Sequence, residues 1–321
     1  MSLKGAFQNS IMQKGQPATA DSLMLEGFIA PLTATVIARL ESAGVQMTSR
    51  IKAGEFGVSG LFVTGDGALS HDVDFALCND YTGAISRAAA LQGLYYIHPT
   101  YGTVSRFGLI PSVTSMDQIG VLCRDPEIGF EVLQIISEYD SKDGMMSSGN
   151  FENNKAANEQ PLRIKGDTNN PETCFDPCFP CLQIMQILCC AELSNNISRY
   201  DGIKFGHRSK EYNGLQELYT KSRTEVFGDD VKLAAIIGAM VLSQENYTRY
   251  YEKAMKIRRV IKDSFEFEKY DVIATCCPTL SRLCGYPALT TPECTYIADI
   301  RREDALRAVY ARRQGVVCDG V

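Results

Sequence analysis

Three cysteines lie close enough together in the sequence to hold a metal ion. Cys174, Cys178 and Cys181 occur in the segment CFDPCFPC. Thiolates at this spacing are ligands for zinc or for an iron–sulfur cluster. No second C-x-x-C pair and no ligand-spaced histidine follows them. We therefore expect no metal and no other cofactor.

The remaining thiols and imidazoles leave one further chemistry open. Two adjacent pairs, Cys189-Cys190 and Cys276-Cys277, lie in apolar segments, where cysteine usually acts as a small core hydrophobe. A nucleophilic Cys-His pair stays possible if the fold brings the partners together. The candidate histidines are His71, His98 and His207. With 12 cysteines and no visible secretory signal, we expect a reduced, cytoplasmic protein.

Several segments resemble a known family of hydrolases. They include AAALQGLYYIHPTYGTVSRFGLIPSVTSMDQIG (88–120), AELSNNISRYDGIKFGHRS (191–209) and LCGYPALTTP (283–292). In this order they are similar to the amidase signature family. Within it they are most similar to the glutaminase chain of tRNA-dependent amidotransferases, the A-type chain, which releases ammonia from glutamine. The resemblance implies an α/β fold with a mixed sheet surrounded by helices.

The catalytic residues that the resemblance implies are replaced. The family uses a Ser nucleophile, a second Ser that relays the proton and a Lys that acts as the base. The resemblance places Gln8 at the Lys, Asn79 at the relay Ser and Ala84 at the nucleophile. An amide cannot act as the base, and a methyl group cannot act as the nucleophile. The loss of a single member of such a catalytic unit already lowers the reaction rate severely.

Two features near the expected site could still bind a substrate group or act as a nucleophile. The turn Asp80-Tyr81-Thr82-Gly83 could bind an anion in the manner of the family's oxyanion hole. A gap of one residue in the alignment would bring Ser86 towards the nucleophile position. The same resemblance puts Lys232, Leu233, Ala234 and Ala235 where the family usually has two arginines, and Met185 and Gln186 where it has tyrosines. Without that arginine pair, binding of the glutamine carboxylate is doubtful.

These replacements favour a catalytically impaired relative of the A-type chain with a binding or assembly role. Its expected partners are B- and C-type amidotransferase subunits. The alternative is an active amidohydrolase with a relocated nucleophile, Ser86 or a cysteine.

The net charge of −6 argues against direct nucleic-acid binding. The longest apolar stretch, LAAIIGAMVL, is too short to span a bilayer, so we expect no membrane association.

Composition and periodicity predict one α/β domain over residues 1–321. Residues 31–44 form a predicted helix, which Thr33 caps and Gly44 ends. Residues 45–51 form a predicted strand. Residues 139–172 are predicted to form a polar segment on the surface, with one short strand at 162–166. Further predicted elements are helices over 229–267, a buried strand at 269–278 and a last helix over 302–315. The segment 102–110 fits either a strand or an irregular loop. The segment between Pro278 and Leu283 is shorter than the resemblance would imply.

Overall fold

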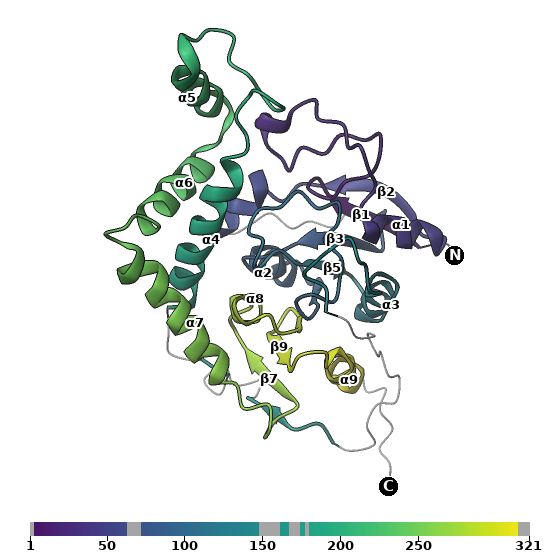
Figure 1. The fold of residues 1–321 in the computed structure, drawn as a ribbon. Coiled ribbons are helices and arrows are strands. Elements are labelled where there is room, and N and C mark those ends of the chain that lie inside the picture. Colours follow the sequence, from purple (N-terminus) through teal and green to yellow (C-terminus); the bar gives the residue numbers. More distant parts are fainter. Residues whose placement is uncertain (1–2, 63–71, 148–160, 167–173, 177–179, 314–321) are drawn as a thin grey trace.

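A single mixed β-sheet forms the centre of the molecule (Figure 1). The computed structural model describes residues 3–62, 72–147, 161–166, 174–176 and 180–313. In this part of the chain the strand order is β2-β1-β3-β5-β4-β8-β9-β7-β6. The strands are β1 (Lys4–Gln8), β2 (Gln46–Ile51), β3 (Phe75–Asn79), β4 (Tyr95–His98), β5 (Ile119–Cys123), β6 (Ile164–Lys165), β7 (Val272–Thr275), β8 (Ala288–Thr290) and β9 (Thr295–Ala298).

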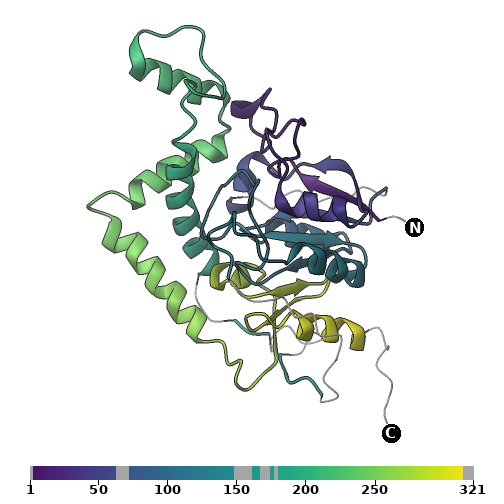
Figure 2. The same cartoon turned by 45° about the vertical axis from the view of Figure 1, so that its right-hand side comes forward.

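Helices cover both faces of this sheet. The α-helices in the described part of the chain are α1 (Thr35–Ser42), α2 (Ala84–Leu91), α3 (Pro126–Ile136), α4 (Cys181–Ile197), α5 (Gly214–Val226), α6 (Asp229–Val241), α7 (Lys253–Asp263), α8 (Thr279–Cys284) and α9 (Glu303–Arg313). Figures 1 and 2 show α1, α3 and α9 together on one face. On the other face α8 packs against α4, which packs in turn against α6 and α7. The α5 helix projects from the body in both views.

The strands in the middle of the sheet are buried along their whole length. Every residue of β3 and β5 is buried, as a sheet covered on both faces requires. Alternate residues then face two different cores. Phe7, Leu77 and Ile97 belong to the core under α1, α3 and α9, whereas Ala76 and Tyr96 pack towards α2. The predicted fold class, a mixed sheet surrounded by helices, is confirmed.

Most of the elements predicted from periodicity are present. The predicted helix over 31–44 is α1, the strand at 45–51 is β2, and the strand at 269–278 is β7. Gly44 adopts a φ of 82° just after α1, in the left-handed conformation expected of it. The predicted cap was wrong, because Ala34 precedes the helix and makes no side-chain cap. Thr33 accepts a hydrogen bond from the Lys14 N–H instead, at 3.1 Å.

The structure shows the conformation of three further segments. The stretch 102–110 is an irregular loop, which Arg106 ties to Asp143 by paired hydrogen bonds of 3.0 Å. The short strand predicted at 162–166 is β6, which pairs with β7 in parallel. The helical region 229–267 is interrupted by a π-helical turn at Tyr247–Glu252. No helix in the described part of the chain is long and apolar enough to cross a membrane.

Candidate active site

The ends of two neighbouring strands bring Gln8 and Asn79 together. Gln8 ends β1, Asn79 ends β3, and these strands pair in parallel. The Asn79 backbone N–H donates to the Gln8 Oε1 at 2.7 Å. Both side chains are buried. Gln8 therefore serves as a hydrogen-bond acceptor in the interior, at the place where the resemblance implies a basic lysine.

The Asn79 side chain is also engaged on both of its polar atoms. Its Nδ2 donates to the Asp117 carboxylate at 2.9 Å, and its Oδ1 accepts from the Gln118 N–H at 2.9 Å. Asp117 in turn accepts from the N–H groups of Ser112 and Val113. Burial raises the pKa of Asp117, and the hydrogen bond from Asn79 opposes that rise. Asn79 thus joins β3 to the loop before β5, which is a structural role.

A buried methyl group lies at Ala84, where the resemblance implies the nucleophile. Ala84 is the first residue of α2, and its N–H donates to Thr82 Oγ1 at 3.2 Å. Gly83 precedes it with a φ of 82°. A short helical segment, η2 (Glu55–Leu61), lies directly against this turn. A methyl group added at Gly60 would lie 2.6 Å from the Ala84 Cβ and 2.4 Å from Thr82 Oγ1.

Two side chains of the turn at residues 80–83, which is predicted to bind an anion, are hydrogen-bonded within the protein. The Asp80 carboxylate accepts from the N–H groups of Ile85 and Ser86, at 3.1 and 3.0 Å. These amides at the start of α2 are therefore used internally. Tyr81 is buried, and its hydroxyl donates to the Phe56 carbonyl at 2.9 Å. The turn is thus fixed between α2 and η2.

A buried arginine that the sequence did not single out completes this network. Arg282, in α8, donates to the Asp80 carboxylate at 2.9 Å and to the Ser86 hydroxyl at 3.0 Å. The Ser86 hydroxyl donates to Asp80 at 2.8 Å and is fully buried. The Arg282 guanidinium also lies over the Tyr96 ring, 5.4 Å from its centroid. An arginine between Leu280 and Leu283 was the available signal, because a charge inside an apolar stretch needs a buried partner.

His98 lies in the interior near Arg282. It is buried, and its Nδ1 has no hydrogen-bond partner among the described residues. Burial, with the Arg282 charge as the second cause, holds the pKa of His98 well below its usual range. His207 lies elsewhere and contacts Glu225 at 2.7 Å. His71 lies outside the described residues, and within them the predicted Cys-His pair is supported by no contact.

The residues that the resemblance places at the family's substrate-binding positions have structural contacts within this protein. Lys232 is 3.9 Å from Asp229 of its own helix, and Ala234 is buried in the core. Met185 is buried as well, and Gln186 donates to the Leu61 carbonyl at 2.6 Å. The Gln186 contact holds the C-terminal end of η2 against α4. Leu233 and Ala235, the other two of these positions, lie on α6.

The cysteines fall into two environments. Cys189 and Cys190 are buried in the core, as predicted. The same prediction was wrong for Cys276, which is exposed, and for Cys277, which is half-buried. Of the three cysteines with metal-ligand spacing, Cys174 is half-buried, Cys181 is buried, and Cys178 lies outside the described residues. No group of three or more potential ligands occurs within the ranges that the structure describes.

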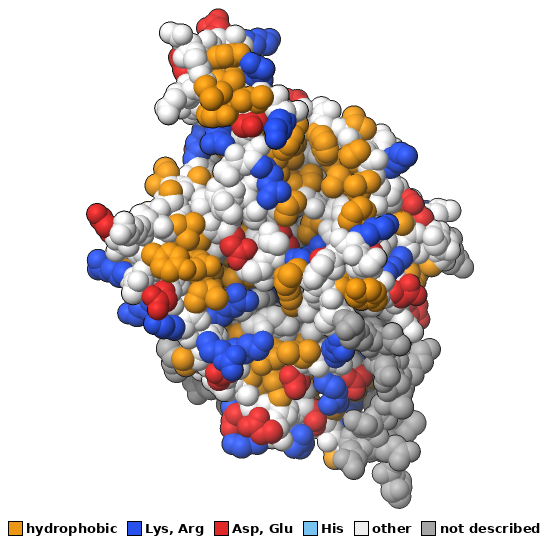
Figure 3. All heavy atoms as spheres, viewed as in Figure 1, with side chains coloured by type: hydrophobic (Ala, Val, Ile, Leu, Met, Phe, Trp, Pro, Cys, Tyr) orange, Lys and Arg blue, Asp and Glu red, His pale blue; other side chains and the backbone are white. Residues whose placement is uncertain are grey.

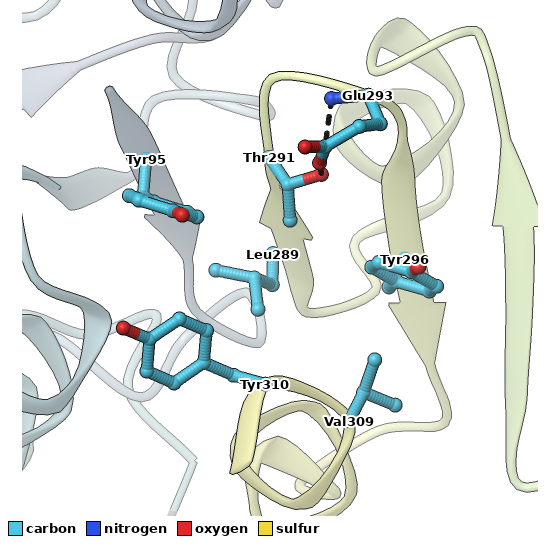
Figure 4. Close-up of a pocket in the computed structure, with 7 residues that line it drawn as sticks. All are labelled: Tyr95, Leu289, Thr291, Glu293, Tyr296, Val309 and Tyr310. Atoms are coloured by element: carbon cyan, nitrogen blue, oxygen red, sulfur yellow. Dashed lines mark hydrogen bonds between the residues drawn. The ribbon is translucent and has the colours of Figure 1, made fainter. Parts of the chain in front are cut away.

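A pocket of about 300 Å³ lies on the opposite face of the sheet, beside α9 (Figure 4). Tyr95 and Tyr310 flank it, with ring centroids 5.7 Å apart. Glu293 lies at its rim and pairs with Thr291 at 2.8 Å. The other lining residues are Leu289, Tyr296 and Val309. The predicted site residues are not part of this pocket.

Sequence comparison identifies relatives along most of the chain. The Amidase family model matches residues 67–179 and 167–301. The A-type chain of the glutamyl-tRNA(Gln) amidotransferase of Lachnoclostridium phytofermentans is 32% identical over 92% of this chain and 71% of its own length. The corresponding chain of Wolinella succinogenes is 31% identical over 91% of this chain and 77% of its own length.

Solved structures of amidases share the fold. A 6-aminohexanoate cyclic dimer hydrolase superposes with a TM-score of 0.73 at 15% identity, over 98% of this chain and 84% of its own. The peptide amidase of Stenotrophomonas maltophilia gives a TM-score of 0.70 at 15% identity, over 98% and 83% of the two chains. From the family model and the relatives above 30% identity, this chain belongs to the amidase family.

Proposed function

We propose that this chain is a catalytically impaired member of the amidase family that acts by binding or assembly. The observation that supports this most directly is the pair Gln8 and Ala84, which offers neither a base nor a nucleophile. Both residues are buried, and η2 packs over Ala84. Restoring hydrolysis would thus require a change of packing as well as of chemistry.

The alternative, a relocated nucleophile at Ser86, gains no support from the contacts of that residue. Its hydroxyl is fully buried and is engaged by Asp80, Gly83 and Arg282. A serine needs a base to remove its proton and a path for the substrate. An ionised carboxylate that already pairs with an arginine is a poor base. We therefore do not adopt this alternative.

The proposed partners are B- and C-type amidotransferase subunits, because the relatives above are named as the A-type chains of such enzymes. Figure 3 shows hydrophobic side chains gathered over α6 and the start of α7. Among the exposed apolar residues of α6, Ile236 is 67% exposed and Met240 is 45% exposed. Such a patch is typical of an interaction surface. In this proposal the protein is cytoplasmic, and a partner carries any contact with tRNA.

The test is co-purification of the full chain with B- and C-type subunits, followed by analytical ultracentrifugation. The proposal predicts one complex that contains all three chains. The same sample is then assayed for glutamine hydrolysis, which the proposal predicts to be absent. A monomeric chain that binds neither partner would contradict the proposed assembly role. Turnover of glutamine would contradict the proposed loss of catalysis.

A further inference from the structure

The pocket beside α9 combines three tyrosine side chains with one carboxylate (Figure 4). Its volume of about 300 Å³ falls at the lower end of the range for pockets that hold small ligands. Tyr95 and Tyr310 lie on one side of the pocket, Tyr296 lies across from them, and Glu293 lies at the rim. The residues at which the resemblance implies catalysis do not line it. The pocket is therefore a second candidate site, with a chemistry of its own.

Two of the tyrosine rings form a corner. The rings of Tyr95, in β4, and Tyr310, in α9, have centroids 5.7 Å apart and planes inclined at 74°. The Tyr310 hydroxyl lies 3.5 Å from the carboxylate of Asp125, the residue before α3. Tyr296, in β9, is buried. Because the face of an aromatic ring carries negative electrostatic potential, rings set at such an angle can surround a cation.

The carboxylate at the rim is held in place by a buried threonine. The hydroxyl of Thr291 donates to the Glu293 carboxylate at 2.8 Å and accepts from the Glu293 N–H at 3.3 Å. Thr291 is 2% exposed, whereas Glu293 is exposed. Glu293 is the one charged side chain among the described residues that line the pocket. The pocket thus has a positioned negative charge at its rim, which attracts a cation.

The remaining walls decide which kind of cation fits. Leu289 and Val309 line the pocket with apolar surface. A primary ammonium group would need an acceptor for each N–H that it buries, since an N–H group buried without an acceptor costs free energy. A quaternary ammonium group has no N–H, and its methyl groups can pack against apolar side chains and tyrosine rings. These walls therefore suit a methylated ammonium group better than a primary one.

We propose that this pocket binds a small quaternary ammonium compound with the size and charge of choline. The cation lies between the ring corner of Tyr95 and Tyr310 and the ring of Tyr296, and the Glu293 carboxylate balances its charge. This binding needs neither a base nor a nucleophile. It is therefore independent of whether the chain hydrolyses amides.

Isothermal titration calorimetry of the full chain with choline tests the proposal. The expected result is saturable binding with a Kd of about 1 mM or lower. The neutral compound 3,3-dimethylbutan-1-ol has the shape of choline, with a carbon atom in place of the nitrogen. It should bind about tenfold more weakly, because it lacks the charge that the rings and the carboxylate attract. The absence of saturable choline binding, or equal binding of the two compounds, would overturn the proposal.

Variants of the lining residues separate the roles of charge and ring. Glu293→Gln should weaken choline binding about tenfold. Glu245→Gln, at an exposed position outside the pocket, is the matched control and should bind as the unmodified chain does. Tyr310→Phe keeps the ring and should retain binding, whereas Tyr310→Leu should weaken it about tenfold. Thermal melts check that each variant is folded.

Two results with the variants would contradict the proposal. The first is choline binding by Glu293→Gln as tight as that of the unmodified chain. The second is an equal loss of binding in Glu245→Gln and Glu293→Gln, which would indicate a general effect of surface charge. Both comparisons decide the matter even if Tyr310→Leu does not fold, because Glu293 and Glu245 are exposed.

Discussion

At the scale of single residues, the positions at which the resemblance implies catalytic groups lie in the interior. Gln8 accepts a hydrogen bond from the Asn79 backbone, and Asn79 pairs with Asp117 and Gln118. Each residue satisfies polar groups that burial would otherwise leave unpaired. The amide groups at these positions are thus explained by packing.

Gln8→Lys should therefore destabilise the protein rather than restore a base. The change removes the acceptor of the Asn79 N–H and buries an ammonium group without a partner, so we expect a loss of about 2–4 kcal/mol in unfolding free energy. Urea denaturation measures this loss. Gln16→Lys, at an exposed position, is the control and should change stability by less than about 0.5 kcal/mol. Equal stability of the two variants would contradict the structural role of Gln8.

Arg282→Met should be one of the most damaging single changes in the chain. It leaves the Asp80 carboxylate buried without its cation, which costs about 3–5 kcal/mol in comparable buried pairs. The double variant Asp80→Asn, Arg282→Met should recover part of that loss, because no unpaired charge remains. Thermal and urea unfolding of the single and double variants form a double-mutant cycle. Strictly additive losses would show that the two residues are not coupled.

Alkylation of Cys277 should depend on pH as a low-pKa thiol does. The hydrogen bond from Cys181 lowers the pKa of Cys277 to about 6, so the rate of its reaction with iodoacetamide should rise with pH and reach half its plateau near that pH. An ordinary thiol reaches half its plateau near pH 8.5. The Cys181→Ala variant, which removes that hydrogen bond, should shift the midpoint upward. A midpoint above pH 8 in the unmodified chain would contradict this environment.

At the scale of elements, η2 lies against the start of α2, with Gly60 close to Thr82 and Ala84. Gly60→Ala would push a methyl group into Thr82 and Ala84, so we expect about 1–3 kcal/mol of destabilisation. Gly144→Ala is the matched control, because a methyl group there meets nothing within 4 Å. Urea denaturation of both variants checks this. A neutral Gly60→Ala would mean that η2 does not pack over the turn.

Local periodicity predicted many of the elements but few of the contacts. The helix α1, the strand β7 and the helix α9 carry regular apolar patterns, and their positions followed from them. The loop 102–110 stayed undecided because its conformation depends on Arg106 meeting Asp143, which lies 37 residues away. The Asp80–Arg282 pair spans 202 residues, so the sequence could indicate that Arg282 needs a buried partner but not which residue it is. The resemblance implies a site at Gln8 and Ala84, whereas only the fold shows that η2 packs against the start of α2.

At the scale of the whole molecule, the amidase fold remains while an apolar surface stays exposed. Ile236→Asp should abolish binding to the B- and C-type subunits and leave stability within about 0.5 kcal/mol, because the side chain is 67% exposed. Leu91→Asp, at an 84% exposed position on α2, is the control and should bind normally. Co-purification and thermal melts check both variants. Normal binding by Ile236→Asp would place the interface elsewhere.

The most direct measurement is glutamine hydrolysis by the purified chain, alone and with the B- and C-type subunits. A variant that carries Gln8→Lys, Asn79→Ser and Ala84→Ser is measured beside it, with its folding checked by circular dichroism. We expect the unmodified chain to release no ammonia above a heat-denatured blank in either setting. Saturable ammonia release by the unmodified chain, abolished by one substitution within it, would contradict the claim that catalysis is lost.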